Sequence, residues 1–73
     1  MTKGQYRVGT TFNPNGNEEV DNIKQRAAEL IDLIESVGDN TIPEVGRLRA
    51  LASTAIEEGA MWAVKAATKR PTP

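Results

Sequence analysis

The sequence predicts an all-α protein: an antiparallel helical hairpin with an extended N-terminal arm, assembling into a homo-oligomer. Apolar residues recur at helical spacing in two segments, residues 17–37 and 41–68. Only a short turn separates these segments, so we expect the two helices to pack antiparallel. The chain has 73 residues and no cysteine. It buries little of its own surface and has no disulfides, so partner subunits are the expected source of additional stability.

Residues 1–16 form the expected arm, separate from a hairpin domain over residues 17–70. Three glycines and the turn signal Asn13-Pro14-Asn15-Gly16 interrupt any helical pattern there. The alternative interpretation is a partly disordered terminus. The arm nevertheless holds two cations and two of the chain's three aromatic residues, namely Lys3, Tyr6, Arg7 and Phe12.

The first helix is expected over residues 17–37. Asn17 is a suitable N-cap, and the acidic residues that follow it suit the positive end of the helix dipole. Gly38 offers the left-handed residue that commonly ends a helix. The apolar residues share one face, which consists of Val20, Ile23, Ala27, Leu30, Ile31, Ile34 and Val37.

The second helix is expected to begin with a capping box, in which Thr41 is the cap and Glu44 follows three residues later. Pro43 is tolerated in the first turn, and the helical pattern continues to about Thr68. Two apolar stripes follow this helix, and one partner helix cannot cover both. The first has heptad spacing and contains Val45, Leu48, Ala52, Ala55, Gly59, Trp62 and Ala66. The second contains Leu51, Ile56, Met61 and Val64.

Trp62 lies among small residues on the second helix, beside a glycine in the helix interior. Such a glycine costs about 1 kcal/mol relative to alanine, so Gly59 needs a compensating contact. One interpretation places Trp62 in the core of the hairpin itself. We favour a core between subunits, because a two-helix hairpin has too little area to stand alone. The expected oligomer interface is Ala52, Ala55, Gly59, Trp62 and Ala66.

The composition argues against catalysis. Without histidine or cysteine, only a serine–lysine pair could supply a nucleophile and base, and both serines look like ordinary helix residues. Glu57 and Glu58 are adjacent and point about 100° apart on a helix, so they form no carboxylate dyad. We expect no catalytic residue, no metal site and no cofactor.

Charge and hydropathy narrow the possible partners further. A net charge of −1 disfavours polymeric nucleic acid, and with it a DNA-binding hairpin. No apolar run reaches the roughly 18 residues of a membrane helix, and no signal peptide is recognisable. We therefore expect a soluble cytoplasmic protein that binds a ligand without transforming it.

Motifs spread over residues 12–69 resemble a known family. They are Phe12-Asn13-Pro14-Asn15-Gly16-Asn17, Ile23-Lys24, Ala27-Ala28-Glu29-Leu30-Ile31-Asp32 and Ile56-Glu57-Glu58 with Ala60-Met61-Trp62-Ala63. In these the chain is similar to the phage anti-CBASS cyclic-nucleotide sponges, whose hairpin domain also occurs in anti-Thoeris sponges. The resemblance implies a homohexamer in the host cell cytoplasm. It would sequester cyclic dinucleotide messengers, and in some members cyclic trinucleotides, without cutting them.

The resemblance also implies where the ligand binds. Pockets of the family form between protomers and use an N-terminal aromatic residue and a lysine on the first helix. Tyr6 and Lys24 are the matching positions, while Arg7 and Phe12 add a cation and a stacking surface. A solvated lysine and a surface or core-capping tyrosine are the structural alternatives.

A second site is expected at the start of the second helix. Arg47 matches the arginine of a further family motif, but the acid and serine of that motif are missing here. Three copies of Arg47, or alternatively of Arg49, would line a three-fold axis that suits a cyclic trinucleotide. Alternatively, these arginines pair with Asp32 or Glu35 of the first helix.

A rival class of function is a helical protein–protein adaptor or structural oligomerisation module. It would dock on another protein through the second apolar stripe. That hypothesis explains the apolar residues equally well, but it gives no role to the basic and aromatic residues of the arm.

Overall fold

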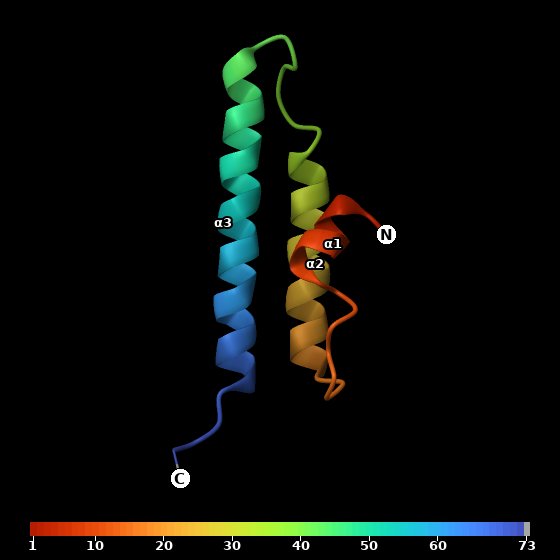
Figure 1. Ribbon diagram of the computed structural model, residues 1–73, viewed down its shortest axis with the longest axis vertical. Coiled ribbons are helices and arrows are strands. Elements are labelled where there is room, and N and C mark those ends of the chain that lie inside the picture. Colours follow the sequence, from red (N-terminus) through yellow and green to blue (C-terminus); the bar gives the residue numbers. More distant parts are fainter. Residues whose placement is uncertain (73) are drawn as a thin grey trace.

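The computed structural model describes residues 1–72, and this part of the chain contains three helices and no strand. They are α1 (Lys3–Val8), α2 (Glu18–Ile34) and α3 (Pro43–Thr68). The last two run antiparallel side by side, and α1 packs on α2 (Figure 1). The molecule is elongated, with extents of 54 × 25 × 13 Å. The predicted all-α hairpin is confirmed.

The N-terminal segment is a helix, which corrects the prediction of an extended arm. Thr2 and Gln5 form a capping box around the start of α1, with the Thr2 Oγ1 accepting from the Gln5 N–H at 3.1 Å. In return, the Thr2 N–H donates to the Gln5 Oε1 at 2.8 Å. Gly9 ends the helix in the left-handed conformation. Six residues are too few to show a periodic pattern, so the Thr2-x-x-Gln5 capping signature was the available local sign of this helix.

Gly4 docks α1 on α2. It is buried, and a Cβ added to it would lie 2.2 Å from the backbone oxygen of Ala28. Its N–H donates to the Asp32 Oδ1 at 2.8 Å, which places a carboxylate at the positive end of α1. The exposed pair Lys3–Glu35 adds a second link at 3.1 Å. The glycine that suggested a helix breaker is therefore the residue that allows the close approach.

The start of α2 agrees with the prediction and its end does not. Asn17 is the N-cap, and its side chain accepts from the Val20 N–H at 3.2 Å. The helix ends at Ile34, three residues before the predicted position, and Val37 belongs to the turn. Gly38 does adopt a left-handed φ of 87°, but within that turn rather than directly at the helix end.

The predicted capping box of α3 is wrong. The N-cap is Ile42, which makes no side-chain capping bond. The Thr41 hydroxyl and N–H instead donate to the Asp39 Oδ1, at 2.7 and 2.9 Å. These bonds, the hydroxyl's first, hold the pKa of the Asp39 carboxyl below its ordinary value. Pro43 in the first turn and the end at Thr68 agree with the prediction.

The core lies between α2 and the inner face of α3. Its buried residues are Val20, Ala27, Ala28, Ile31, Ser53 and Ala60. The interpretation that Trp62 fills the hairpin core is wrong, because this side chain is 59% exposed. The other predicted interface residues lie on the same outer side: Ala55, Gly59 and Ala66 are exposed and Ala52 is half-buried.

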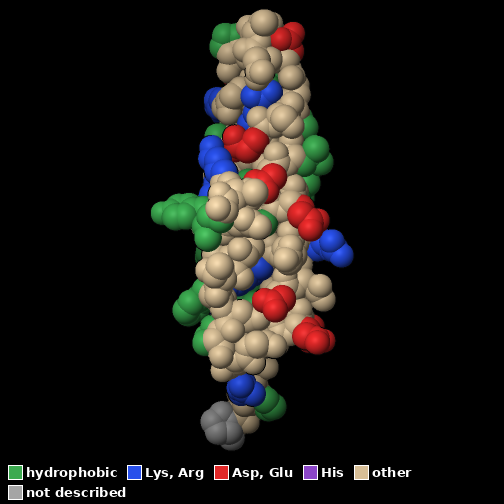
Figure 2. Space-filling model, turned by 90° about the vertical axis from the view of Figure 1, so that its right-hand side faces the viewer, with side chains coloured by type: hydrophobic (Ala, Val, Ile, Leu, Met, Phe, Trp, Pro, Cys, Tyr) green, Lys and Arg blue, Asp and Glu red, His purple; other side chains and the backbone are tan. Residues whose placement is uncertain are grey.

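The second apolar stripe divides between the two sides of α3. Ile56 and Val64 are half-buried, whereas Leu51 and Met61 are exposed. Acidic and basic side chains are interspersed over the face shown in Figure 2, without a large region of one sign. Because Leu51 and Met61 are exposed, the outer side of α3 keeps an apolar surface that the single chain does not cover.

Candidate ligand-binding site

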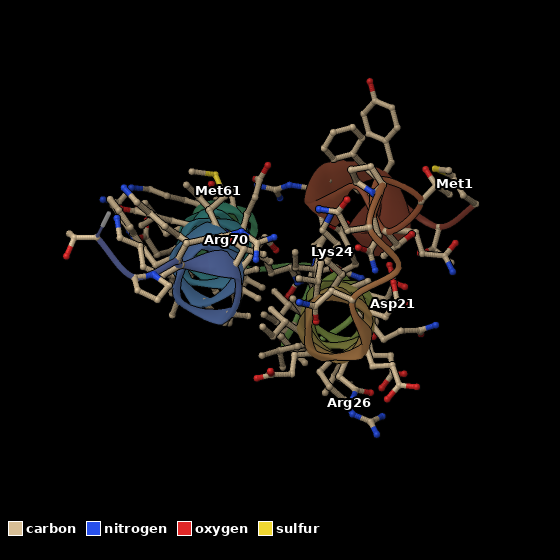
Figure 3. All side chains as sticks on the ribbon, turned by 90° about the horizontal axis from the view of Figure 1, so that it is seen from below. Met1, Asp21, Lys24, Arg26, Met61 and Arg70 are labelled. Carbon is tan, nitrogen blue, oxygen red and sulfur yellow. The ribbon has the colours of Figure 1, made fainter. Side chains whose placement is uncertain are left out.

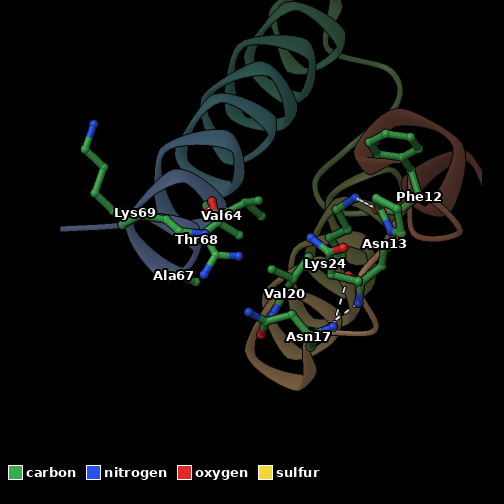
Figure 4. Close-up of a pocket in the computed structure, with 12 residues that line it drawn as sticks. Phe12, Asn13, Asn17, Val20, Lys24, Val64, Ala67, Thr68 and Lys69 are labelled. Carbon is green, nitrogen blue, oxygen red and sulfur yellow. Dashed lines mark hydrogen bonds between the residues drawn. The ribbon is translucent and has the colours of Figure 1, made fainter. Parts of the chain in front are cut away.

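A cleft of about 540 Å³ lies at the end of the hairpin remote from the α2–α3 turn. Its volume falls within the range of roughly 300–1,000 Å³ typical of small-molecule sites. The walls come from the loop before α2, from α2 itself and from the end of α3 (Figure 4). The lining residues are Phe12, Asn13, Pro14, Asn15, Asn17, Val20, Lys24, Val64, Ala67, Thr68, Lys69 and Arg70.

Lys24 is the buried cation of this cleft, with 8% of its surface exposed. Its ammonium donates to the backbone oxygen of Gly9 at 2.9 Å and to that of Phe12. It also lies 5.4 Å from the centroid of the Phe12 ring, a cation–π distance. An ammonium group has three N–H donors, so one remains after the two carbonyls. Lys24 therefore anchors the N-terminal loop with two of its three donors.

Asn13 fixes the loop wall of the cleft. Its amide donates to the Asn17 backbone oxygen at 2.9 Å and to the Asp21 Oδ1 at 2.8 Å. Its Oδ1 accepts the Asn17 N–H at 3.2 Å (Figure 4). Gly16 provides the left-handed residue within this loop, with φ 62°. The wall is thus held in place by hydrogen bonds within the chain.

The two aromatic residues of the predicted site lie in different places. Phe12 lines the cleft and is 73% exposed, so its ring is accessible for stacking. Tyr6 is 77% exposed on α1 and lines neither this cleft nor the smaller one described next.

Arg7 ties α1 to α3. Its Nη2 and Nε donate to the Glu57 Oε2 at 2.9 and 3.2 Å, and Nη2 also contacts the Thr54 hydroxyl at 3.3 Å. Together with Lys24 it lines a second cleft of about 280 Å³, beside Met61. In the single chain the Arg7 guanidinium is thus engaged by protein groups.

Arg47 lies at the opposite end of α3, about 30 Å along the helix from the cleft. Its Nη1 contacts the Glu44 Oε1 at 2.6 Å within the same helix. The alternative that these arginines pair with acids of the first helix is wrong, because Arg49 donates to the backbone oxygen of Val37 at 2.6 Å. The single chain therefore brings Lys24 and Phe12 together, with Arg7 nearby, and leaves Tyr6 and Arg47 apart.

Comparison with known proteins identifies the family. Residues 3–68 match the sequence model described as Acb2/Tad1, hairpin domain, which spans all three helices. The chain belongs to the Acb2/Tad1 family. This is the anti-CBASS and anti-Thoeris sponge family, known for phage proteins that sequester cyclic nucleotides. No curated protein and no solved structure gives a significant match to the chain.

Membership of the Acb2/Tad1 family implies binding rather than catalysis. The described residues contain no group of three or more carboxylates that could hold a metal ion. Over the same residues, no helix is long and apolar enough to cross a membrane.

Several cleft residues of this Acb2/Tad1 hairpin were missed by sequence reasoning. An antiparallel hairpin places the end of α3 beside the start of α2, so the two cations that follow α3 belong to the same end as Lys24. The antiparallel topology could therefore have identified these two cations as cleft residues. The cleft-lining residues that were not predicted are Asn13, Pro14, Asn15, Asn17, Val20, Val64, Ala67, Thr68, Lys69 and Arg70.

Proposed function

We propose that this protein binds cyclic dinucleotide second messengers and sequesters them intact, as a phage immune-evasion protein in the host cell cytoplasm. The observation that carries the proposal is the cleft in which the Lys24 ammonium lies beside the exposed Phe12 ring. A cyclic dinucleotide has two phosphates and two flat bases. It therefore needs cations and stacking surfaces, and the cleft offers both.

Tyr6 has a place in this proposal only if chains assemble. Its ring stands in solvent in the single chain and lines no cleft there. We propose that a second copy brings Tyr6 over the base of a ligand held at Lys24, so that the complete pocket forms between protomers. Tyr6→Ala should then weaken binding without changing the fold, since the side chain makes no buried contact.

The proposed assembly is a homohexamer that covers the outer side of α3. Ala55, Gly59, Trp62 and Ala66 are exposed there, and a Cβ on Gly59 would meet nothing within 4 Å in the single chain. In an isolated chain, Gly59→Ala should therefore stabilise α3 by about 1 kcal/mol. Where a neighbouring helix packs against Gly59, the same change should weaken the oligomer, and Gly59→Leu should disrupt it. Light scattering of the wild type and both variants measures the mass of the oligomer.

The ligand itself is tested by thermal-shift screening and calorimetry with cyclic di-AMP, cyclic di-GMP and cyclic GMP-AMP. At 100 times its Kd, a ligand should stabilise the protein by about 2.7 kcal/mol. The nucleotide recovered after heat release should be the intact ring. Linear products would indicate an enzyme, and the absence of any shift would contradict sequestration.

A cyclic trinucleotide is the second proposed ligand, bound on a three-fold axis of the hexamer by Arg47 or its alternate Arg49. Arg47 is exposed, and its one polar partner among residues 1–72 is Glu44, so ligand phosphate could replace this carboxylate. Calorimetry with cyclic tri-AMP should give one ligand per three chains, unaffected by saturation with a dinucleotide and lost in Arg47→Ala. Competition between the two ligands would argue for one shared site.

The rival adaptor function is favoured by one observation. Leu48, Leu51, Met61 and Trp62 all remain exposed along α3. A monomer in light scattering that binds none of the nucleotides would favour this function over sequestration.

A further inference from the structure

Arg70 lines the same cleft as Lys24 but comes from the other wall, two residues beyond the end of α3. Seen along the hairpin in Figure 3, Arg70 lies at the end of α3 on the side that faces α2 and Lys24. The cleft therefore has a cation on each wall: a buried ammonium from α2 and a guanidinium from the segment after α3.

Arg70 differs from every other arginine of the chain in having no protein partner within residues 1–72. Arg7 binds Glu57, Arg26 binds Glu29 and Arg47 binds Glu44. The remaining one, Arg49, binds the backbone oxygen of Val37. No hydrogen bond or ion pair of Arg70 exists among the described residues, so its five N–H donors are directed at solvent and cleft alone.

We propose that Arg70 binds the second phosphate of a two-phosphate ligand whose first phosphate is held by Lys24. This inference rests on the proposed function and specifies how charge is recognised within the site. Lys24 spends two of its three donors on the carbonyls of Gly9 and Phe12, so it cannot hold two phosphates. A guanidinium is suited to the other, because its planar fork binds a phosphate through two parallel N–H···O bonds.

Lys69 provides a matched control within the chain. It carries the same charge, adjoins Arg70 and experiences the same C-terminal helix dipole. It also borders the cleft, but Figure 4 shows its side chain directed away from it. A general requirement for positive charge at this end would make the two residues equivalent, whereas a direct contact makes only Arg70 important.

The test is calorimetry with cyclic di-AMP on the wild type, Arg70→Ala, Arg70→Lys and Lys69→Ala. Loss of a charge-assisted phosphate contact should raise the Kd of Arg70→Ala about tenfold or more. Lys69→Ala should stay within about twofold of the wild type, and Arg70→Lys should lie between, because a lysine keeps the charge but loses the fork. Circular dichroism should show unchanged helicity, since both positions follow the end of α3.

The one-phosphate ligand 3′,5′-cyclic AMP distinguishes the phosphate contact of Lys24 from that of Arg70. Its affinity is measured by displacement of cyclic di-AMP and should change little in Arg70→Ala, so the preference for the two-phosphate ligand should shrink. An equal loss for both ligands, an equal loss in Lys69→Ala, or no loss in Arg70→Ala would overturn the role of Arg70 and leave sequestration standing. If the wild type binds cyclic di-GMP or cyclic GMP-AMP instead, the same variants are compared with that ligand; a wild type that binds none of the three cyclic dinucleotides would overturn both proposals.

Discussion

At each end of the hairpin, a cationic side chain binds backbone oxygens of a loop, but the surroundings of the two cations differ. At the turn end, the Arg49 guanidinium donates to the backbone oxygens of Val37 and Gly38, at 2.6 and 3.5 Å. At the other end, the Lys24 ammonium donates to the backbone oxygens of Gly9 and Phe12. In each case a long cation ties a loop to a helix, and the cleft of about 540 Å³ lies at the Lys24 end.

The two ends differ because the N-terminal segment, which contains α1 and the loop after it, packs on α2 as a third layer. Only α2, α3 and their short turn meet at the turn end, and the apolar side chains of Val37 and Ile42 remain exposed there. At the Lys24 end, the loop that connects α1 to α2 supplies one wall of the cleft, and α1 itself packs on α2 (Figure 1). The N-terminal segment, rather than the hairpin alone, therefore creates the candidate site.

Displacing α1 from α2 should have the largest effect on stability. Gly4→Ala would place a Cβ 2.2 Å from the Ala28 backbone oxygen, which cannot move without distorting α2. We expect a loss of about 3 kcal/mol or more, at the upper end for overpacking, measured by urea unfolding. Ligand binding should be lost together with the docked α1. Gly46→Ala, at a position in α3 with open space around the new Cβ, is the control: it should not destabilise the protein, should raise stability by up to about 1 kcal/mol through helix propensity, and should leave binding intact. Unchanged stability of Gly4→Ala would contradict the docked α1.

The two loop-binding cations should differ in a direct comparison. Lys24→Met removes a buried charge-assisted contact to two carbonyls and should cost about 2 kcal/mol. Arg49→Met removes bonds that the structure leaves solvent-exposed, and should cost about 0.5 kcal/mol. Urea unfolding measures both, and hydrogen exchange of the amides in residues 9–17 should increase only in the Lys24 variant. Equal losses of stability in the two variants would mean that Lys24 and Arg49 anchor their loops equally strongly.

Ser53 lies between the two ends and should respond independently of either. Its hydroxyl is buried, with the residue 1% exposed, and has no hydrogen-bond partner among the described residues. Ser53→Ala should therefore stabilise the protein by about 1 kcal/mol, because the unpaired hydroxyl no longer has to be desolvated. The exposed Ser36→Ala should change stability by less than about 0.5 kcal/mol. Destabilisation of Ser53→Ala would show that the hydroxyl has a partner in solution.

The smallest effect concerns the turn end. The Thr41 hydroxyl lowers the pKa of the Asp39 carboxyl from its ordinary value of 3.8. Because the pKa is depressed in the folded chain, this stabilisation is present above 3.8 and is lost as pH falls through the folded pKa. Thr41→Val should raise the pKa of Asp39 toward 3.8 in an NMR titration. Binding at the Lys24 end should not change, and a concurrent loss of affinity would show that the two ends are coupled.

The sequence by itself determined the two long helices. Apolar spacing specifies an amphipathic helix within one segment, and Asn17 marks the start of α2 through a bond to a residue only three positions away. These are local effects that depend on neighbouring residues alone. Lys24 was also expected as a ligand-binding residue because it matches the family's lysine on the first helix, and Phe12 because an aromatic ring offers a nucleotide base a stacking surface.

Only the tertiary structure decided the form of the N-terminal segment and the membership of the cleft. Whether Gly4 breaks a helix or docks one depends on Asp32 and Ala28, and the bond to Asp32 spans 28 positions. Arg7 was predicted for a ligand, but Glu57 lies 50 positions away and engages it in the fold. Arg70 enters the site because the hairpin folds back on itself. Local spacing carries no information on such contacts, since they exist only once the helices have packed.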